Sequence, residues 1–231
     1  MKKINNFAIL SLLMEIKYFG QSSFLIKTRE AKLVTDPFDP KMVGLKYPKV
    51  EADIVTISHE HKDHNQADLV SSPEGSEKLV INLPGEYEKK GVRVFGFGSF
   101  HDKQKGAKLG SNTLYKIEAE GISILHCGDL GVVLEDSFVD LIGAVDILLV
   151  PVGGVYTIDA TEATELVKKF GPSLVIPMHF KSDPDKQKDL PLSTVDDFLK
   201  KMGISSVTPI PKLVIKKEEL EEEMKVVVLE I

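Results

Sequence analysis

The sequence predicts an α/β protein, in the mixed α+β arrangement, with two β-sheets packed face to face and helices on their outer faces. Three observations support this fold class. Strand patterns come first along the chain, strands then alternate with helices, and strand patterns return at the end. The alternating part contains almost wholly apolar runs, which are typical of strands covered on both faces. The 231 residues suffice to bury a large core, and no interdomain linker or sharp internal repeat interrupts them.

The first part of the chain is expected to form strands joined by turns. Two prolines between residues 36 and 40 end the third strand, because proline cannot continue a strand ladder. A loop through 46–48 then leads to the next strand, a short helix is expected at 66–70, and Pro84-Gly85 predicts a turn. The strands are expected at 15–19, 23–28, 31–35, 53–57, 78–83 and 91–100.

The second part alternates strands and helices. Asp159 and Glu162 form a capping box for a helix that ends at Phe170, before Gly171. Apolar residues at helical spacing predict another helix over 135–142. The remaining elements are a hairpin near 112–118 and 122–126, buried strands at 146–150 and 173–178, a helix near 193–202, and strands near 213–216 and 225–230.

We expect residues 14–231 to form a single domain and residues 1–13 to be an extension ahead of an alternative start at Met14. The extension faintly resembles a signal peptide but lacks a cleavage site, and a membrane tether is the alternative interpretation. Elsewhere no apolar run approaches the length of a bilayer-spanning helix. The only cysteine, Cys127, excludes an intramolecular disulfide and fits a reducing compartment, so we expect a cytoplasmic protein.

The net charge of −6 gives no reason to expect nucleic acid or an anionic membrane as a partner. We expect a small-molecule substrate, with an anionic one among the candidates. Three lysines between 103 and 108 could attract an anion, although a solvated loop explains them as well. The sequence leaves the oligomeric state open.

One stretch concentrates metal-binding chemistry at the end of the apolar run 53–57. His59 and His61 are two residues apart, so in an extended chain they point to the same side and could hold one ion. Asp63 and His64 follow after a turn, which directs them most economically to a second ion. Neutral imidazole and carboxylate are ordinary ligands of zinc and neighbouring divalent metals. The alternative is a polar loop with several histidines by coincidence, which this spacing disfavours.

All the histidines lie at or near the ends of predicted strands, where ligands bind in open α/β sheets. Asp63 and Asp129 occupy similar positions, so the pattern indicates one shared site, although a lone histidine such as His101 or His179 is more often structural. The histidines are His59, His61, His64, His101, His126 and His179.

The amino-acid sequences of several segments resemble the conserved motifs of the metallo-β-lactamase superfamily. The resemblance covers nearly the whole chain. It is most similar to a branch of small Zn-dependent hydrolases related to ascorbate-phosphate lactonases and phospholipase-D-type enzymes. Many of those relatives have histidine where this chain has Gln21, so no role is transferred to that residue. The matching segments are DPF at 36–38, HEHKDH at 59–64, FHD at 100–102, LHCGD at 125–129, PVGG at 151–154 and PMHF at 177–180.

The resemblance implies a four-layer αββα sandwich and a dinuclear metal site. It implies that His59, His61 and His101 hold one metal. It also implies that Asp63, His64 and His179 hold the other, that Asp129 bridges the two, and that Asp36 supports the metal loop. Zinc is the expected metal, with Mn²⁺ or Fe²⁺ as alternatives.

Such a site favours hydrolysis, because metal-bound water can have its pKa lowered from about 15.7 to near 7 and a bridging hydroxide can then attack. Asp63 and Asp129 are the candidate catalytic residues, since either could accept the proton. His126 is expected in the surrounding shell, hydrogen-bonded to a ligand or to its loop. Cys127 is interpreted as a buried apolar residue rather than a ligand, and the aromatic rings of Tyr156 and Phe180 either line the pocket or pack in the core.

We therefore expect a metal-dependent hydrolase that cleaves a small ester, lactone or phosphoester, a substrate choice that rests on resemblance alone. The alternatives are a phosphodiesterase or nuclease on the same fold and a metal-binding protein that catalyses nothing. A di-iron oxidoreductase is disfavoured, because such relatives generally have glutamate at the position of His61 and carry a flavin domain.

Overall fold

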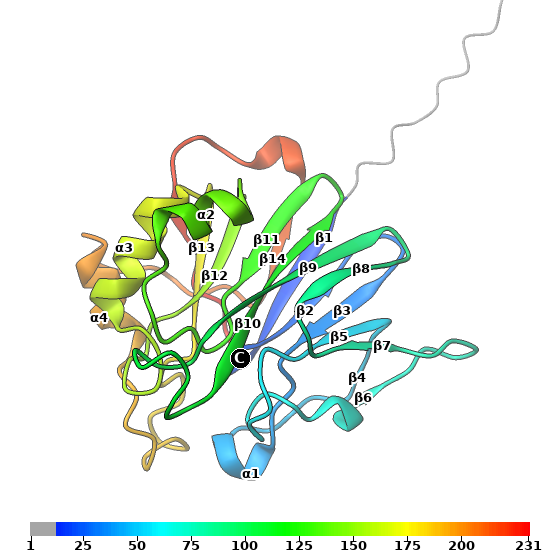
Figure 1. Cartoon of the computed structure of the whole chain (residues 1–231), viewed down its shortest axis with the longest axis horizontal. Coiled ribbons are helices and arrows are strands. Elements are labelled where there is room, and N and C mark those ends of the chain that lie inside the picture. Colours follow the sequence, from blue (N-terminus) through cyan, green and yellow to red (C-terminus); the bar gives the residue numbers. More distant parts are fainter. Residues whose placement is uncertain (1–12) are drawn as a thin grey trace, which may run out of the picture.

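Two β-sheets pack against each other in the computed structural model, which describes residues 13–231 (Figure 1). The first sheet contains antiparallel strands at one side and parallel strands at the other. Its strands, in spatial order, are β14 (Leu213–Ile215), β1 (Met14–Gly20), β2 (Ser23–Lys27), β3 (Lys32–Thr35), β5 (Ile54–Thr56) and β7 (Leu79–Ile81).

The second sheet is also mixed. Its strands β8 to β11 pair antiparallel, whereas the strands from β11 to β15 pair parallel. In spatial order they are β15 (Lys225–Val226), β13 (Leu174–Met178), β12 (Ile147–Pro151), β11 (Ile122–His126), β10 (Ser111–Ala119), β9 (Val92–Phe100) and β8 (Gly85–Lys89).

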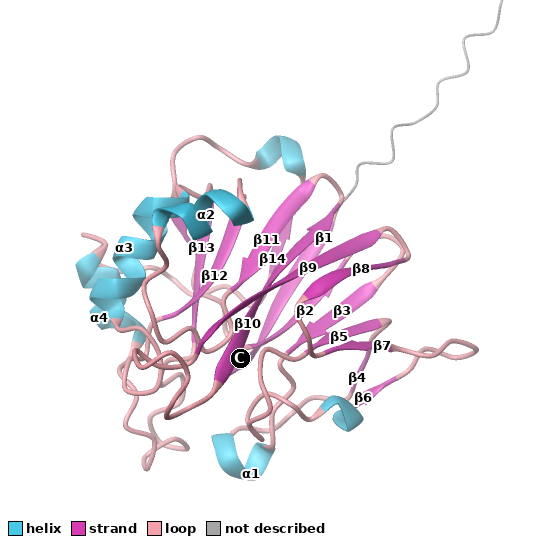
Figure 2. Cartoon of the chain, in the orientation of Figure 1, coloured by secondary structure: helices cyan, strands magenta, loops and turns pink. Residues whose placement is uncertain are grey.

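The longer helices lie together on the outer side of the second sheet (Figure 2). They are α2 (Asp136–Ile142), α3 (Ala160–Phe170) and α4 (Val195–Lys201). The predicted capping box is present at the start of α3, and Gly171 ends that helix in the left-handed conformation. The buried face of α3 includes Leu166 and Val167, which belong to the main core.

Short elements cover the outer face of the first sheet. Val34 and Val55 point away from the main core and pack with residues of β4 (Val50–Glu51), the 3₁₀ helix η1 (Ala67–Leu69) and β6 (Val70–Ser71). The helix α1 (Pro40–Val43) adds Val43 to a neighbouring cluster. This layer therefore contains turns of helix and a two-stranded sheet in place of long helices.

Three predictions of local structure need correction. No helix was predicted between the end of the third strand at 36–40 and the loop at 46–48, but Asp39 caps α1 and Pro40 occupies its first turn, where proline needs no N–H partner. The strand β8 was not predicted beyond the turn at Pro84-Gly85. The predicted strand over 225–230 is confined to β15, with an isolated bridge farther on at Leu229.

The predicted α/β sandwich is confirmed. The main core lies between the sheets and beneath the helices, and strand residues such as Ile16, Ile54, Tyr115 and Ile124 are fully buried in it. The prediction for residues 1–13 falls, except for Leu13, outside the described residues. Within residues 13–231 we find no helix with the length and apolarity needed to cross a membrane.

The packing of the two sheets brings several strand ends to one edge of the sandwich. β3 and β5 run parallel in the first sheet, and β9, β11 and β13 run in a common direction in the second. The residues that follow these strands include Asp36, His59, His101, Asp129 and His179.

Candidate metal centre

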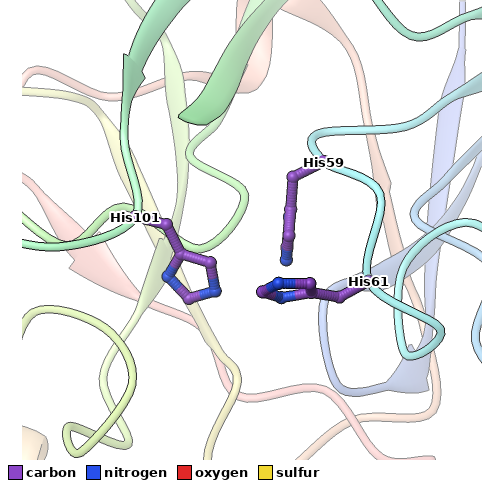
Figure 3. Close-up of side chains that lie close together, drawn as sticks. All are labelled: His59, His61 and His101. Carbon is purple, nitrogen blue, oxygen red and sulfur yellow. The ribbon is translucent and has the colours of Figure 1, made fainter. Parts of the chain in front are cut away.

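Three imidazoles meet at this edge from two distant segments. His59 and His61 follow β5, and His101 follows β9. One ligand atom from each lies within 4.8 Å of the others, and the ring centroids are 4.5 to 5.2 Å apart. Figure 3 shows the three rings directed toward a common point. His59 and His101 are buried, and His61 is partly exposed.

A second cluster contains Asp63, His64, Asp129 and His179, whose ligand atoms also lie within 4.8 Å of one another. Oδ2 of Asp129 is 3.2 Å from Nε2 of His64 and 3.1 Å from Nε2 of His179. The same oxygen is 3.4 Å from Nε2 of His101 and 4.0 Å from Nε2 of His59. Asp129 therefore joins the two clusters.

Asp36 connects the clusters from the protein interior. Its Oδ1 accepts the backbone N–H of Ser58 at 2.7 Å, and its Oδ2 accepts the Ser58 hydroxyl at 2.6 Å. Oδ2 also lies 2.9 Å from Nδ1 of His64, and the Ser58 hydroxyl lies 2.9 Å from Nδ1 of His59. One buried carboxylate thus orients an imidazole of each cluster.

Asp129 is held by residues that the sequence did not single out. Its backbone N–H donates to Oδ1 of Asn112 at 2.9 Å, and the Ser22 hydroxyl donates to its Oδ1 at 3.3 Å. Nε2 of His126 lies 2.8 Å from the carbonyl oxygen of Ser22. His126 therefore supports the loop beside Asp129 rather than contacting a cluster residue directly. Ser22 and Asn112 are single polar residues in strand-rich segments, a pattern too common to mark a site.

The loop after His101 folds around a second carboxylate. Asp102 accepts backbone N–H groups at 2.7 to 3.2 Å, and their donors are Gln104, Gly106, Lys108 and Leu109. Gly131 lies against this loop so closely that an added Cβ would be 2.2 Å from the carbonyl oxygen of His101. The lysines of the loop are exposed, and Lys103 pairs with Glu162 on α3.

The electrostatic environment differs between the two clusters. Burial lowers the pKa of His59 to about 3, which keeps its imidazole neutral. Burial would also lower the pKa of His64, but the carboxylates of Asp129, Asp36 and Asp63 raise it well above its usual value. Burial opposes ionisation of Asp63, yet the hydrogen bond and charge of His64 bring its pKa down to about 2.

These residues fit divalent metal ions. Nε2 of His59 and Oδ1 of Asp63 are buried and have no hydrogen-bond partner within the described part of the chain. Buried polar atoms without partners are costly unless something else satisfies them. Imidazole and carboxylate groups with lone pairs directed at shared positions are the donors that zinc, manganese and iron accept.

A cavity of about 450 Å³ opens onto both clusters. Its walls carry Met42, Lys62, Leu109 and Tyr156, and Tyr156 is 42% exposed. A neighbouring cavity of about 420 Å³ is more polar and shares His61, Glu60 and Leu109 with the first. A larger groove of about 1,200 Å³ near α1 contains no cluster residue, so its size alone does not mark the site.

The remaining sequence candidates lie outside both clusters. Cys127 is fully buried and belongs to neither cluster, and burial raises the pKa of its thiol. Phe180 is buried and packs 6.0 Å from Tyr18, so it is a packing residue, whereas Tyr156 faces the cavity.

Comparison with known proteins agrees with the fold. Residues 15–179 match the family described as Beta-lactamase superfamily domain, a span that runs from β1 to His179. A metal-dependent hydrolase of Thermoplasma acidophilum is 28% identical over 203 residues, which cover 77% of this chain and 90% of that protein.

A solved structure from Thermotoga maritima, described as an inferred Zn-dependent hydrolase of the metallo-β-lactamase superfamily, is 39% identical. The match covers 94% of this chain and 98% of that one, with a TM-score of 0.74. A metallo hydrolase of Ignicoccus hospitalis shares the fold at 22% identity and a TM-score of 0.66, over 88% of this chain and 99% of that one. The chain therefore belongs to the metallo-β-lactamase superfamily and falls among its metal-dependent hydrolases.

Proposed function

We propose that the protein hydrolyses a small ester, lactone or phosphoester at a site that holds two divalent ions. The ions are zinc in this proposal, with manganese or iron as alternatives. The observation that carries the proposal is the position of Asp129, whose Oδ2 lies 3.1 to 4.0 Å from imidazole nitrogens of both clusters. A carboxylate oxygen in that position suits a ligand shared between two ions.

His59, His61 and His101 would hold one ion, and Asp63, His64 and His179 would hold the other, with Asp129 between them. When bound, the ions supply a water molecule acidic enough to react as hydroxide near neutral pH and a positive charge that stabilises the transition state. The interior network through Asp36 and Ser58 keeps the imidazoles of His64 and His59 in fixed orientations.

Asp63 is the residue we assign to proton transfer. Its side chain lines the cavity, and its buried Oδ1, which has no hydrogen-bond partner among residues 13–231, would serve either as a ligand of the second ion or as the acceptor of a proton. Its Oδ2 faces His64 at 3.4 Å on the opposite side. Asp129 is only 2% exposed and accepts a hydrogen bond from Ser22, so it serves better as a ligand.

The cavity suits a small molecule with an apolar part. Its volume of about 450 Å³ lies within the range of about 300–1,000 Å³ typical of small-molecule sites. Met42 and Tyr156 offer apolar surface, and the exposed side chain of Lys62 offers a cation for an anionic substrate group. We place the activity in the cytoplasm, with no nucleic-acid or membrane partner.

The proposal is tested by loading metal-free protein with Zn²⁺ or Mn²⁺ and assaying an ester, a lactone, a phosphomonoester and a phosphodiester. Substitution Asp63→Ala should lower the rate by about 10²- to 10⁴-fold, the usual contribution of a positioned acid or base. Asp129→Ala should abolish the activity, while the exposed carboxylate variant Asp68→Ala should retain it.

The outcomes separate the alternatives. Cleavage of the phosphodiester and of nucleic acid, but not of the ester or lactone, would identify a nuclease. Tight metal binding without hydrolysis of any substrate would favour a non-catalytic protein. Full activity in Asp63→Ala and Asp129→Ala would contradict the proposed roles of both residues.

A further inference from the structure

Gln21 lies in the turn between β1 and β2, and its backbone is hydrogen-bonded to the backbone of His179. Its carbonyl oxygen accepts the N–H of His179 at 2.7 Å and the hydroxyl of Tyr18 at 2.8 Å. Gln21 is only 4% exposed, and its φ of 54° lies in the left-handed region that residues other than glycine rarely adopt. The surrounding contacts therefore hold this residue beside the second cluster in a strained conformation.

The side chain of Gln21 enters the second cluster. Nε2 lies 2.9 Å from Oδ2 of Asp63 and 2.8 Å from Nε2 of His179, whereas the buried Oε1 has no hydrogen-bond partner among the residues that the structure describes. A buried amide oxygen without a partner is costly. The amide thus has one end among the cluster's ligand atoms and the other end unsatisfied.

The distances match those between ligands of one ion. Donor atoms bound at about 2.0–2.2 Å from a metal lie about 2.8–3.1 Å apart when they are at right angles and about 3.3–3.6 Å apart in a tetrahedron. In this cluster the distances between carboxylate oxygens and imidazole nitrogens are 3.1 to 3.4 Å. They join Asp63 and Asp129 to His64, and Asp129 to His179. The end of the Gln21 amide lies at nearly the same spacing, 2.8 to 2.9 Å, from two of these residues.

A half-turn about the last side-chain bond exchanges the amide nitrogen and oxygen. The nitrogen is a donor of hydrogen bonds and carries no lone pair for a metal, whereas the oxygen accepts and is a ligand for harder divalent ions. The half-turn would place Oε1 where Nε2 now lies, beside Asp63 and His179, and would leave Nε2 at the position that has no partner among the described residues. On this basis we propose that Gln21 is a further ligand, through Oε1, of the ion held by Asp63, His64, Asp129 and His179. The assignment rests on the proposed function.

The extra oxygen has a chemical consequence. It adds one more side-chain ligand atom to the ion of the second cluster. This atom is an amide oxygen, a type of ligand that manganese accepts more readily than soft metals do. Loss of the Gln21 oxygen should therefore weaken binding of Mn²⁺ or Co²⁺ at this cluster and leave the three-histidine cluster unchanged.

The test is a titration of metal-free protein with Co²⁺, followed by visible absorption and by competition with a chelating dye. Gln21→Leu removes the amide, and Gln21→Glu restores an oxygen donor. Gln187→Leu is the matched control, because Gln187 is equally buried but its amide binds the backbone near residues 182 and 43. Thermal unfolding of each metal-free variant checks that it is folded.

We expect wild-type protein to bind in two steps. In Gln21→Leu one step should weaken by more than the roughly tenfold that follows loss of a residue partnering a ligand, because a ligand itself is lost. The absorption of that step should intensify because the ion has lost a ligand. Gln21→Glu should keep the wild-type spectrum, and Gln187→Leu should bind like wild type.

Two results would overturn the ligand assignment alone. In the first, Gln21→Leu binds Co²⁺ in the same two steps and with the same affinities as wild type. In the second, Gln21→Leu binds Co²⁺ more weakly but keeps the wild-type absorption spectrum. The second result would mean that Gln21 acts by donating to Asp63. Wild-type protein that fails to bind a second ion would instead overturn the proposed function, and the assignment with it.

Discussion

Nδ1 of His64 lies 2.9 Å from Oδ2 of Asp36, a residue 28 positions earlier in the chain. The same carboxylate accepts two hydrogen bonds from Ser58, whose hydroxyl contacts His59. The end of β3 therefore fixes the orientation of imidazoles in both clusters. Partners of this kind usually contribute to metal affinity without contacting the metal.

Replacing this carboxylate should weaken metal binding. In Asp36→Ala, His64 and Ser58 lose their shared acceptor, so metal affinity should fall by about 10- to 100-fold. Competition with a chelating dye measures the change. Asp39→Ala is the control, because Asp39 caps α1 and its loss should cost about 1 kcal/mol of stability while leaving metal affinity unchanged. Equal metal affinities in Asp36→Ala and wild type would show that Asp36 does not contribute to metal binding.

The strands that lead to the two clusters were predictable, because each has its own local pattern. An apolar run followed by His59, His61, Asp63 and His64 marks both a strand and its chemistry, and His179 directly follows the wholly buried strand β13. The distances between these segments depend on how two sheets pack, which no local pattern specifies. The sequence could therefore propose a shared site but not its geometry.

Other features were missed because their structure depends on distant partners. Gln21 and Asn112 are single polar residues whose roles appear only when β13 and β11 lie beside them. The strand β8 is an edge strand whose exposed residues show no buried face, and its pairing with β9 decides its conformation. Helix α1 is too short for apolar periodicity, and only its cap and proline indicate it.

Cys127 should be unreactive in the folded protein. Its side chain is fully buried, and burial raises the pKa of the thiol, so little thiolate is available. A thiol reagent such as a disulfide dye should label about one sulfur per chain in denaturant and almost none in native protein. Rapid labelling of native protein that also releases metal would show instead that the thiol takes part in the site.

Asp53 should contribute stability that depends on pH. Burial would raise its pKa, but the hydrogen bond from Lys90 and the backbone N–H of Lys32 lower it below the usual value. Because the folded pKa is depressed, the contribution is present above the unfolded pKa of about 3.9 and disappears as pH falls through the folded value.

Urea unfolding of metal-free wild type and Asp53→Asn checks this expectation. The stability difference between the two proteins should be larger at about pH 6 than at about pH 3, where the wild-type carboxylate begins to be protonated. Lys90 is exposed, so the effect should be small. A difference that stays constant over this range, or grows toward acid, would contradict a depressed pKa at Asp53.

The most direct test of the central claim is the metal content of the purified protein after equilibration with excess Zn²⁺ or Mn²⁺ and removal of free metal. Elemental analysis should find two ions per chain, one for each cluster. His101→Ala and His179→Ala should each lose one ion, because each removes a ligand from a different cluster. Folded wild-type protein that holds no metal would contradict the account. So would wild-type protein that holds a single ion, if both variants retain that ion.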